Sequence, residues 1–418
     1  MTILPVEIEP LLHEENRVKT NHLDPPRLDQ ADHAPQTNQV LPEMSLAFLV
    51  STTSAKSPPF RYTLIMEPTS SSSSANQDII KLRAQLDSVV VPPDLHAQAT
   101  EMIDRLERMI NQGFYTEEFE RTRHYLNWIT ALPWDKRVTQ PIDLNTIAQT
   151  LEQHHYGMQE VKDRILEYMS VYKLRQSQSD GIARSPLIFL VGLVGTGKTT
   201  FASALSQALG RPLGRIPFGG MGSARDLRGQ SRLHLEAEPG YVIKALKQAG
   251  VKNPIILLDE IDRVSESART DIMGVLVELL DPEQNKAFLD HYIDYPFDLS
   301  EVLFLATANN TTNIATAVLD RLEPIRMPSY SDEEKIHIAR EYLLPRVLEE
   351  SGLSAQQLNI DDSLWPQITR PLGYDAGIRT LKRTLEGIAR KVARQIVAGQ
   401  IQSAHITPEN IKTFLPKW

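Results

Sequence analysis

The run Leu187-Ile-Phe-Leu-Val191 and the stretch Gly192-Leu-Val-Gly-Thr-Gly-Lys198-Thr199 that follows it decide the fold of this chain. An unbroken apolar run of this length predicts a short strand that is buried on both faces. The stretch after it fits the pattern G-x-x-x-x-G-K-[ST], whose glycines allow positive φ values and bring backbone N–H groups against phosphate oxygens. A helix expected over 199–209 directs its positive end at the same phosphates. We therefore expect a nucleotide-binding α/β domain rather than a plain glycine turn.

The side chains of this loop have separate expected roles. Lys198 supplies a point charge near the β- and γ-phosphates, and the Thr199 hydroxyl is placed to ligate magnesium. The expected ligands are therefore ATP and Mg²⁺. The candidate nucleotide-binding residues of the loop and the helix start are Gly192, Gly195, Gly197, Lys198, Thr199 and Thr200.

A second apolar run, Ile255–Leu258, ends in two carboxylates, Asp259 and Glu260. We expect Asp259 to hold magnesium through water and Glu260 to polarise the attacking water as general base. An apolar run that ends in Asp-Glu is common for purely structural reasons, so this interpretation depends on the phosphate loop. Two adjacent acids also favour hydrolysis over phosphoryl transfer to a small molecule.

Two polar residues further along the chain are candidates for the same site. A third apolar run, Val302–Thr307, leads to Asn309, whose amide is placed to orient water between Glu260 and the γ-phosphate. Arg321 lies in Leu319-Asp-Arg321-Leu322 and is placed to reach the γ-phosphate of a neighbouring subunit, which is worth ~10³–10⁵ in rate. Taken alone, Asn309 is more often a turn residue and Arg321 a surface ion pair.

Composition limits the function classes. The chain has 418 residues, a formal net charge of −9 and no cysteine, which excludes disulfides, thiolate metal sites and thiol nucleophiles. Residues 1–75 hold nine of the 27 prolines and end in a serine run. We expect most of this segment to be a disordered tail, with short strands at 46–50 and 62–66 as the alternative.

The remaining chain divides by its apolar patterns. Apolar residues at three- and four-residue spacings predict helices, and short buried runs that alternate with helices predict a parallel sheet. The expected segments are a helical subdomain over 76–180, a large α/β domain over 181–328 and a small helical domain over 329–418.

The order of these motifs resembles the AAA+ ATPase module, and longer blocks resemble the Lon protease family from about residue 78 to the C-terminus. The resemblance implies a three-layer parallel-sheet P-loop NTPase domain, preceded by a helical subdomain and followed by a small helical lid. The blocks that carry it are Tyr125-Leu-Asn-Trp128, Leu132-Pro-Trp134, His155-Tyr-Gly157, Val161-Lys-Asp-Arg-Ile-Leu-Glu-Tyr168, Leu279-Leu-Asp-Pro-Glu-Gln-Asn285, Asp290-His-Tyr292, Pro296-Phe-Asp-Leu-Ser300 and Leu319-Asp-Arg321.

The resemblance also implies roles for single residues. Asn309 would be sensor 1, Arg321 the arginine finger, and Arg379 sensor 2, reaching the phosphates from the small domain. The family assembles as a hexameric ring, which suits a finger that acts in trans. The segment beside the adenine corresponds to His155, Tyr156 and Gly157.

Departures from the family bear on function. Family members continue into a peptidase domain with a serine–lysine dyad, whereas this sequence stops at Trp418, where that domain would begin. It contains no Gly-x-Ser-x-Gly or His-Glu-x-x-His motif, and most of the family's N-terminal substrate-binding domain has no counterpart. We therefore expect this chain not to cleave peptide bonds. The pore loop that grips substrate, an aromatic and an aliphatic residue in the family, corresponds here to His234 and Leu235.

These inferences predict a Lon-type AAA+ motor that couples ATP hydrolysis to protein unfolding and translocation in protein quality control. The expected partners are further copies in a homo-hexamer, or full-length Lon-type subunits in a mixed ring, together with unfolded or damaged proteins. The expected location is the cytoplasm, without membrane contact. Alternatives are a nucleotide-binding regulatory subunit, the ATPase half of a split-gene protease, and a DNA-remodelling protein. The DNA alternative rests on a basic run over 379–394, for which a solvated helix face is the preferred interpretation.

Overall fold

The computed structural model describes residues 70–112, 117–178, 185–234, 236–370 and 375–416, with the backbone alone described for 70–75. All of them belong to one compact unit, Met66–Trp418. The tail expected over most of residues 1–75 lies outside the described residues as far as residue 69, and so do its two apolar patches.

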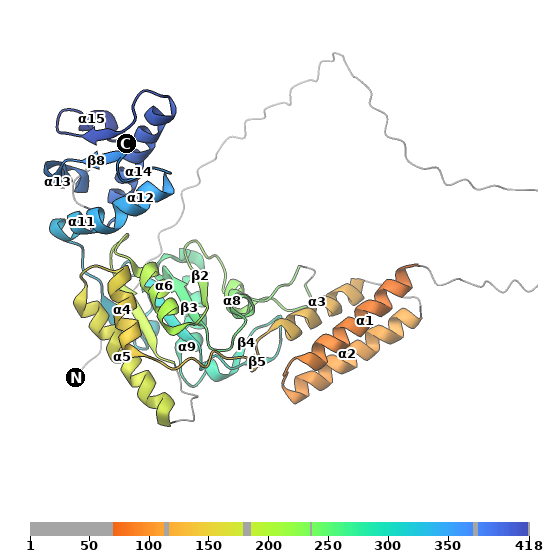
Figure 1. Cartoon of the computed structure of the whole chain (residues 1–418). Helices are drawn as coiled ribbons and strands as arrows, with labels where there is room; N and C mark the ends of the chain where they lie inside the picture. Colours follow the sequence, from red (N-terminus) through yellow and green to blue (C-terminus); the bar gives the residue numbers. More distant parts are fainter. Residues whose placement is uncertain (1–69, 113–116, 179–184, 235, 371–374, 417–418) are drawn as a thin grey trace, which may run out of the picture. The chain divides into compact units, whose positions relative to one another are not determined.

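Helices dominate both ends of the described chain, and most strands lie between them (Figure 1). The strands are β1 (Leu187–Val191), β2 (Leu213–Pro217), β3 (Ile255–Asp259), β4 (Phe288–Leu289), β5 (Pro296–Phe297), β6 (Leu303–Ala308), β7 (Pro324–Arg326), β8 (Leu358–Ile360) and β9 (Ala404–Ile406). The helices are α1 (Ser70–Ser88), α2 (Pro93–Asn111), α3 (Glu117–Ala131), α4 (Leu144–His154), α5 (Gln159–Gln178), α6 (Lys198–Leu209), α7 (Arg225–Arg228), α8 (Tyr241–Ala249), α9 (Arg269–Leu280), α10 (Thr316–Leu319), α11 (Asp332–Ile338), α12 (Leu344–Glu350), α13 (Trp365–Thr369), α14 (Arg379–Val397) and α15 (Ile411–Phe414).

A five-stranded parallel sheet with the order β2-β3-β6-β1-β7 forms the centre of the α/β domain. The register pairs Leu190 of β1 with Thr307 of β6, and Leu257 of β3 with Leu305 of β6. The carboxyl ends of β1, β6 and β3 therefore lie side by side, with β6 in the middle. In an open parallel sheet this edge is where ligands bind.

Alternate residues of the central strands β1, β3 and β6 enter two different hydrophobic clusters. Ile256 and Leu258 of β3 pack in the cluster that includes α8 and α9, whereas Ile255 and Leu257 pack in the cluster that includes α6. All four side chains are fully buried. This is the physical reason for the unbroken apolar runs, because a strand covered by helices on both faces has no solvent side.

Two of the helices before the sheet begin at clear sequence signals. α2 begins at Pro93, directly after Pro92, because proline is accepted in the first turn of a helix. α4 begins after Asp143, whose carboxylate accepts from the N–H groups of Asn145 and Thr146. One contact from this region to the α/β domain is the Tyr125 hydroxyl, which donates to the carbonyl oxygen of Ile293 at 2.9 Å.

The small domain after the sheet, which we call the lid, spans α11 to α15. A capping box starts α11: Ser331 Oγ accepts from Glu334 N, and the Glu334 carboxylate accepts from Ser331 N. The short parallel strands β8 and β9 pair within the lid. α14 buries one apolar face, and its residues Leu381, Leu385 and Ile388 belong to the same hydrophobic cluster that includes α6.

The fold class predicted from the sequence is confirmed: the domain is α/β with a parallel sheet, helices surround it, and a helical lid follows. In the five-stranded sheet, β2 and β7 were not anticipated; nor were the helix α4, the short strands β4 and β5, or the strands β8 and β9 of the lid. α1 begins at Ser70, inside the serine run that was expected to belong to the tail. Among the described helices, none combines the length and the apolar character needed to cross a bilayer.

Candidate nucleotide site

The phosphate loop joins β1 to α6 and depends on three glycines. Gly195 and Gly197 have φ values of +84° and +99°, a region that residues with a Cβ rarely adopt. Gly192 has no room for a side chain, because a Cβ there would lie 2.8 Å from Met327 Cβ and 2.9 Å from Met327 O. The first N–H groups of α6 have no acceptor within the helix, so the loop can offer them to an anion.

Lys198, the first residue of α6, is held inside this loop. Its Nζ donates to Gly192 O at 2.6 Å, to Leu193 O at 3.0 Å and to Asn309 Oδ1 at 3.1 Å. Burial lowers the pKa of the ammonium, while nearby carboxylates, Asp262 foremost, oppose the shift. Because charged acceptors bind an ammonium more strongly than neutral ones, phosphate oxygens can replace these three partners.

The two acids at the end of β3 are held by one threonine. Thr307 Oγ1, on β6, donates to Asp259 Oδ1 at 2.7 Å and accepts from Glu260 N at 2.9 Å. The other oxygen of Asp259, Oδ2, accepts from Arg215 Nε at 2.9 Å and from Arg215 Nη2 at 2.6 Å. Glu260 has a φ of +58°, an uncommon value that turns the chain sharply after the strand. Its half-buried carboxylate lies 3.5 Å from Arg263 Nη1.

Asn309 lies between the loop lysine and the two acids, because β6 runs between β1 and β3. The carboxylate Oδ2 of Asp262 accepts from the backbone N–H of Asn309 at 3.1 Å and of Asn310 at 3.4 Å. Asn309 Nδ2 is buried and has no hydrogen-bond partner among the described residues. A buried donor without an acceptor costs ~1–3 kcal/mol. The site therefore suits an added acceptor at this position, such as a water molecule or a phosphate oxygen.

The expected adenine segment, residues 155–157, lies beside the same loop. His155 stacks on Phe201 of α6 with ring centroids 3.6 Å apart, and a Cβ on Gly197 would lie 3.2 Å from His155 Cε1. Burial lowers the pKa of His155 to about 4, so its imidazole is neutral at pH 7. Tyr156 stacks on His337 of the lid at 4.0 Å. Next to it, Gly157 has a φ of +66°.

Arg379 begins α14, and the residues just before it touch the phosphate loop. Ile378 N donates to Gly195 O at 3.2 Å. A Cβ on Gly195 would lie 3.4 Å from Arg379 Cβ and also 3.4 Å from Gly377 Cα. Arg379 itself is exposed. The structure thus places the predicted sensor 2 residue next to the loop, with its guanidinium accessible to a ligand.

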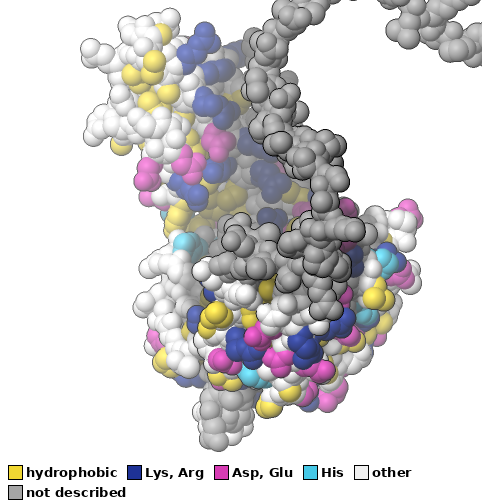
Figure 2. Space-filling view, turned by 90° about the vertical axis from the view of Figure 1, so that its right-hand side faces the viewer, with side chains coloured by type: hydrophobic (Ala, Val, Ile, Leu, Met, Phe, Trp, Pro, Cys, Tyr) yellow, Lys and Arg dark blue, Asp and Glu magenta, His cyan; other side chains and the backbone are white. Residues whose placement is uncertain are grey.

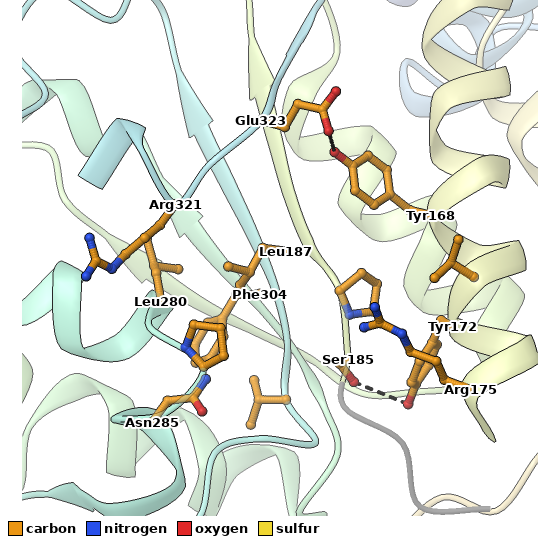
Figure 3. Close-up of a pocket in the computed structure, with 14 residues that line it drawn as sticks. Tyr168, Tyr172, Arg175, Ser185, Leu187, Leu280, Asn285, Phe304, Arg321 and Glu323 are labelled. Atoms are coloured by element: carbon orange, nitrogen blue, oxygen red, sulfur yellow. Dashed lines mark hydrogen bonds between the residues drawn. The ribbon is translucent and has the colours of Figure 1, made fainter. Parts of the chain in front are cut away.

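Arg321 lies away from this cluster. Its Nη2 donates to Asp281 Oδ2 at 2.9 Å, and its Nη1 donates to Ala317 O at 2.8 Å. It lines a cavity of about 390 Å³ together with Leu187 and Phe304, which belong to the amino-terminal parts of β1 and β6 (Figure 3). Because the phosphate loop follows the carboxyl end of β1, Arg321 is not part of the nucleotide site of its own chain.

The loop of the predicted pore residues is pinned at its base and exposed at its tip. His234 is exposed, and Leu235 lies outside the described residues. At the base, the buried carboxylate of Asp290 accepts from Gly240 N at 2.8 Å through Oδ2. Its Oδ1 accepts from Tyr292 N at 2.8 Å. The structure therefore holds His234 at the end of a firmly attached loop.

The basic run over 379–394 lies on α14, and Lys and Arg side chains gather along one side of the lid (Figure 2). Two of its residues are engaged within the lid. Lys391 Nζ donates to the carbonyl oxygens of Thr413 and Leu415, and Lys382 pairs with Glu350 at 3.4 Å. These contacts agree with a helix face that stabilises the lid.

Magnesium fits this site only together with a nucleotide. Among the described residues, no group of three or more acids or histidines is placed to hold a metal ion by itself. Mg²⁺ commonly uses one or two protein ligands plus phosphate oxygens and water. Thr199, which is exposed, and Asp259 offer the oxygen ligands for that arrangement.

Three side chains that shape the site were not predicted from the sequence. They are Arg215 and Thr307, which hold Asp259, and Asp262, which holds the backbone of Asn309. Thr307 could have been found from the sequence, since it is the polar end of the third apolar run. Asp262 could have been found too, as a further acid three positions after Asp259. Arg215 could not, because its partner lies on a strand that its own strand meets only in the folded sheet.

Comparisons with known proteins agree with this geometry. Residues 188–329 match the ATPase family associated with various cellular activities (AAA), and residues 349–405 match the Lon protease AAA+ ATPase lid domain.

Curated relatives point to the same family. Lon protease 2 of Thermus thermophilus is 38% identical over 346 residues, which is 81% of this chain and 43% of the relative. The Lon protease of Lawsonia intracellularis is 40% identical over 341 residues, covering 82% of this chain and 40% of the relative. This chain thus spans about two fifths of the length of the curated relatives it matches. By its AAA domain, its Lon-type lid and these relatives, the chain belongs to the Lon-type AAA+ ATPases.

Proposed function

We propose that this chain binds ATP with Mg²⁺ at the phosphate loop and hydrolyses it with Glu260 as general base. The observation that supports this most directly is the row of contacts across the carboxyl ends of β1, β6 and β3. Lys198 Nζ lies 3.1 Å from Asn309 Oδ1, and Thr307 Oγ1 joins Asp259 Oδ1 to Glu260 N. The loop lysine, the amide and both acids meet at one edge of the sheet, which is the arrangement that phosphate hydrolysis requires.

Each residue has a distinct part in this proposal. Lys198 exchanges its loop carbonyls for phosphate oxygens and neutralises their charge. Asn309, directed by Asp262, orients the attacking water, and Glu260 accepts its proton. Thr199 and, through water, Asp259 would hold Mg²⁺, which would supply neutralisation of the phosphate charge. The remaining nucleotide contacts come from Gly192, Gly195, Gly197, Thr200, His155, Tyr156, Gly157 and Arg379.

Glu260→Gln tests the central assignment. The amide keeps the shape of the side chain and cannot accept a proton, so ATP hydrolysis should fall by at least ~10²-fold while nucleotide affinity stays within ~3-fold of wild type. Glu266→Gln is the matched control, because Glu266 is an exposed acid on the next turn and the substitution removes the same charge. Undiminished hydrolysis by Glu260→Gln would show that another group activates the water.

The proposed biological role is that of a ring-shaped motor. Copies of the chain assemble as a hexamer, and Arg321 of one copy completes the nucleotide site of the next. Hydrolysis moves the loop that carries His234 and pulls an unfolded polypeptide, as part of protein quality control. We assign ATP hydrolysis, and no cleavage of peptide bonds, to the residues of this chain.

A regulatory subunit that joins rings of full-length Lon-type proteins is the second candidate. It is favoured by His234, because an imidazole grips polypeptide less well than the larger aromatic side chain it replaces. The motor and the regulator can be distinguished by the ATPase rate. This rate is measured with and without an unfolded protein, for the wild type and for His234→Tyr. Stimulation in either sample supports the motor. Activity that appears only in mixed rings supports the regulator.

A further inference from the structure

Asp281, directly after α9, has no role in the proposed chemistry, yet its carboxylate is fixed on both sides. Oδ1 accepts from the backbone N–H of Glu283 at 2.9 Å and of Gln284 at 3.3 Å. Oδ2 accepts from Arg321 Nη2 at 2.9 Å and from Arg321 Nε at 3.2 Å. The turn is itself anchored by buried Asn285, whose N–H donates to Asp281 O at 3.0 Å. The carboxylate thus sits on a well-held backbone and presents one oxygen to Arg321.

The hydrogen bonds of Arg321 show which of its N–H groups remain available to a ligand. Nε–H and one N–H of Nη2 donate to Asp281, and one N–H of Nη1 donates to Ala317 O. A guanidinium has five N–H groups. Within the described part of the chain, one N–H on each Nη therefore stays without an acceptor. A pair of N–H groups is what arginine uses to hold two oxygens of a phosphate.

The Arg321 side chain also points in a suitable direction. In Figure 3 its guanidinium points away from the cavity walls formed by Tyr172, Leu187 and Phe304. The side chain is 29% exposed and that of Asp281 is 19% exposed, so the pair lies at the surface and within reach of another molecule.

We propose that Asp281 is the positioning residue of the arginine finger, which holds Arg321 so that its two remaining N–H groups face a nucleotide bound by a neighbouring copy of the chain. This inference rests on the proposed function, because it takes the ring and the contact in trans from there. The backbone N–H of Glu283, and after it Arg321, lower the pKa of Asp281. The carboxylate is therefore charged at neutral pH and pairs with the guanidinium throughout the cycle.

A purely structural ion pair is the competing explanation, and the two differ in what a substitution changes. A single ion pair at the surface, even when partly buried as this one is, contributes little to stability. Displacement of a catalytic group by ~1 Å costs up to ~10²-fold in rate. We therefore expect Asp281→Asn to lower kcat by ~10–100-fold, to change KM by no more than ~3-fold, and to shift Tm by no more than ~2–4 °C.

Asp281→Asn is the sharper of two variants. The Asn oxygen can still accept from Glu283 N and Gln284 N, whereas the Asn amide group presents hydrogens to Arg321 and cannot hold it. Asp281→Ala removes both functions and serves as the second variant. Asp271→Asn is the matched control, because it makes the same substitution at an exposed position in the first turn of α9.

Mixed rings give a readout that a structural role cannot imitate. Asp281→Asn subunits keep an intact Glu260 but hold their finger poorly, whereas Glu260→Gln subunits are inactive but keep a well-held finger. When the two are mixed at equal amounts, about half of the Asp281→Asn subunits have a Glu260→Gln subunit as the neighbour that supplies Arg321 to their nucleotide site. The mixture should therefore restore about half of the wild-type rate per Asp281→Asn subunit. The same mixture with Arg321→Ala in place of Asp281→Asn tests the finger itself.

The outcomes separate the inference from the function on which it rests. Full activity of Arg321→Ala refutes the finger in trans, and with it the role of Asp281. An impaired Arg321→Ala that regains activity in mixed rings, beside a fully active Asp281→Asn, refutes the positioning role alone. An Asp281→Asn variant that stays impaired on mixing also refutes it. Loss of kcat with recovery on mixing supports it.

Discussion

The lid and the phosphate loop lie close together at Gly377, and this contact allows a specific prediction. A Cβ added to Gly377 would lie 2.5 Å from the carbonyl carbon of Gly195 and 2.6 Å from the carbonyl oxygens of Gly195 and Val194. These are backbone atoms, so no side chain can move aside. Ordinary van der Waals contact begins at 3.4 Å, and 3.4 − 2.5 = 0.9 Å is the opening that Gly377→Ala requires.

The expected size of the effect follows from that opening. A forced separation of this kind costs ~1–3 kcal/mol. It also stretches the hydrogen bond from Ile378 N to Gly195 O, which is 3.2 Å long. Arg379 follows directly, so its guanidinium moves with the lid. Because a displacement of ~1 Å costs up to ~10²-fold in rate, we expect Gly377→Ala to lower kcat for ATP hydrolysis by ~10–100-fold.

Steady-state ATP hydrolysis with excess Mg²⁺ measures the kcat of Gly377→Ala, and the thermal unfolding midpoint shows whether the variant is folded. Gly274→Ala is the control, since no atom lies within 4 Å of a Cβ there and alanine favours a helix by ~0.5–1 kcal/mol. It should hydrolyse ATP at the wild-type rate. If Gly377→Ala does the same, the lid does not need this close contact, and the argument that it positions Arg379 is wrong.

Three further predictions concern single side chains. The pKa of His155 is about 4 when folded and about 6.5 when unfolded, so stability should fall by up to ~3 kcal/mol as the pH drops from 6.5 to 4 and should then level off. Urea titrations of wild type and His155→Gln check this, and equal pH slopes would contradict it. Asp290→Asn should lower the free energy of unfolding by ~1–3 kcal/mol, because amide hydrogens would replace an acceptor for the Gly240 or Tyr292 N–H. Asp271→Asn at an exposed position is its control, and equal urea midpoints would contradict it. Arg215→Gln should lower the Mg²⁺ concentration for half-maximal ATP hydrolysis several-fold, because Arg215 donates twice to the oxygen of Asp259. A magnesium titration of the hydrolysis rate measures it, and an unchanged midpoint would show that the ion pair does not compete with the ion.

The strands that the sequence predicted are those buried on both faces. β1, β3 and β6 are apolar apart from Asp259 and Thr307 near their carboxyl ends, and they are buried apart from the two partly buried end residues of β1. β2 was missed because Gly214 and Arg215 interrupt its apolar residues, and it lies at an edge of the sheet. β7 at the opposite edge has only three residues and begins with proline. Edge strands have one paired side, so their sequences carry a weaker pattern.

Candidate site residues that follow a strand in sequence were easy to find, and residues that act across strands were not. Lys198 belongs to the loop motif that follows one apolar run, and Glu260 comes two residues after another, so a linear pattern predicts them. The pairing of Thr307 with Asp259 depends on β6 lying next to β3. Strand order is set by how the whole sheet packs, and no local pattern in a single sequence contains it.

The lid touches the phosphate-loop region at two separate places, and this couples its movement to the nucleotide. On one side Ile378 N donates to Gly195 O. On the other, Tyr156 stacks on His337 of α11, and a Cβ on Gly157 would lie 2.6 Å from Glu334 Oε1. A body held at two points can turn freely only about the line that joins them. Rotation of the lid about any other axis must therefore break the hydrogen bond to the loop or separate the stacked rings, and either change alters the surface that a nucleotide would contact. Under the proposed function, these two contacts would link a change at the nucleotide to a movement of the lid.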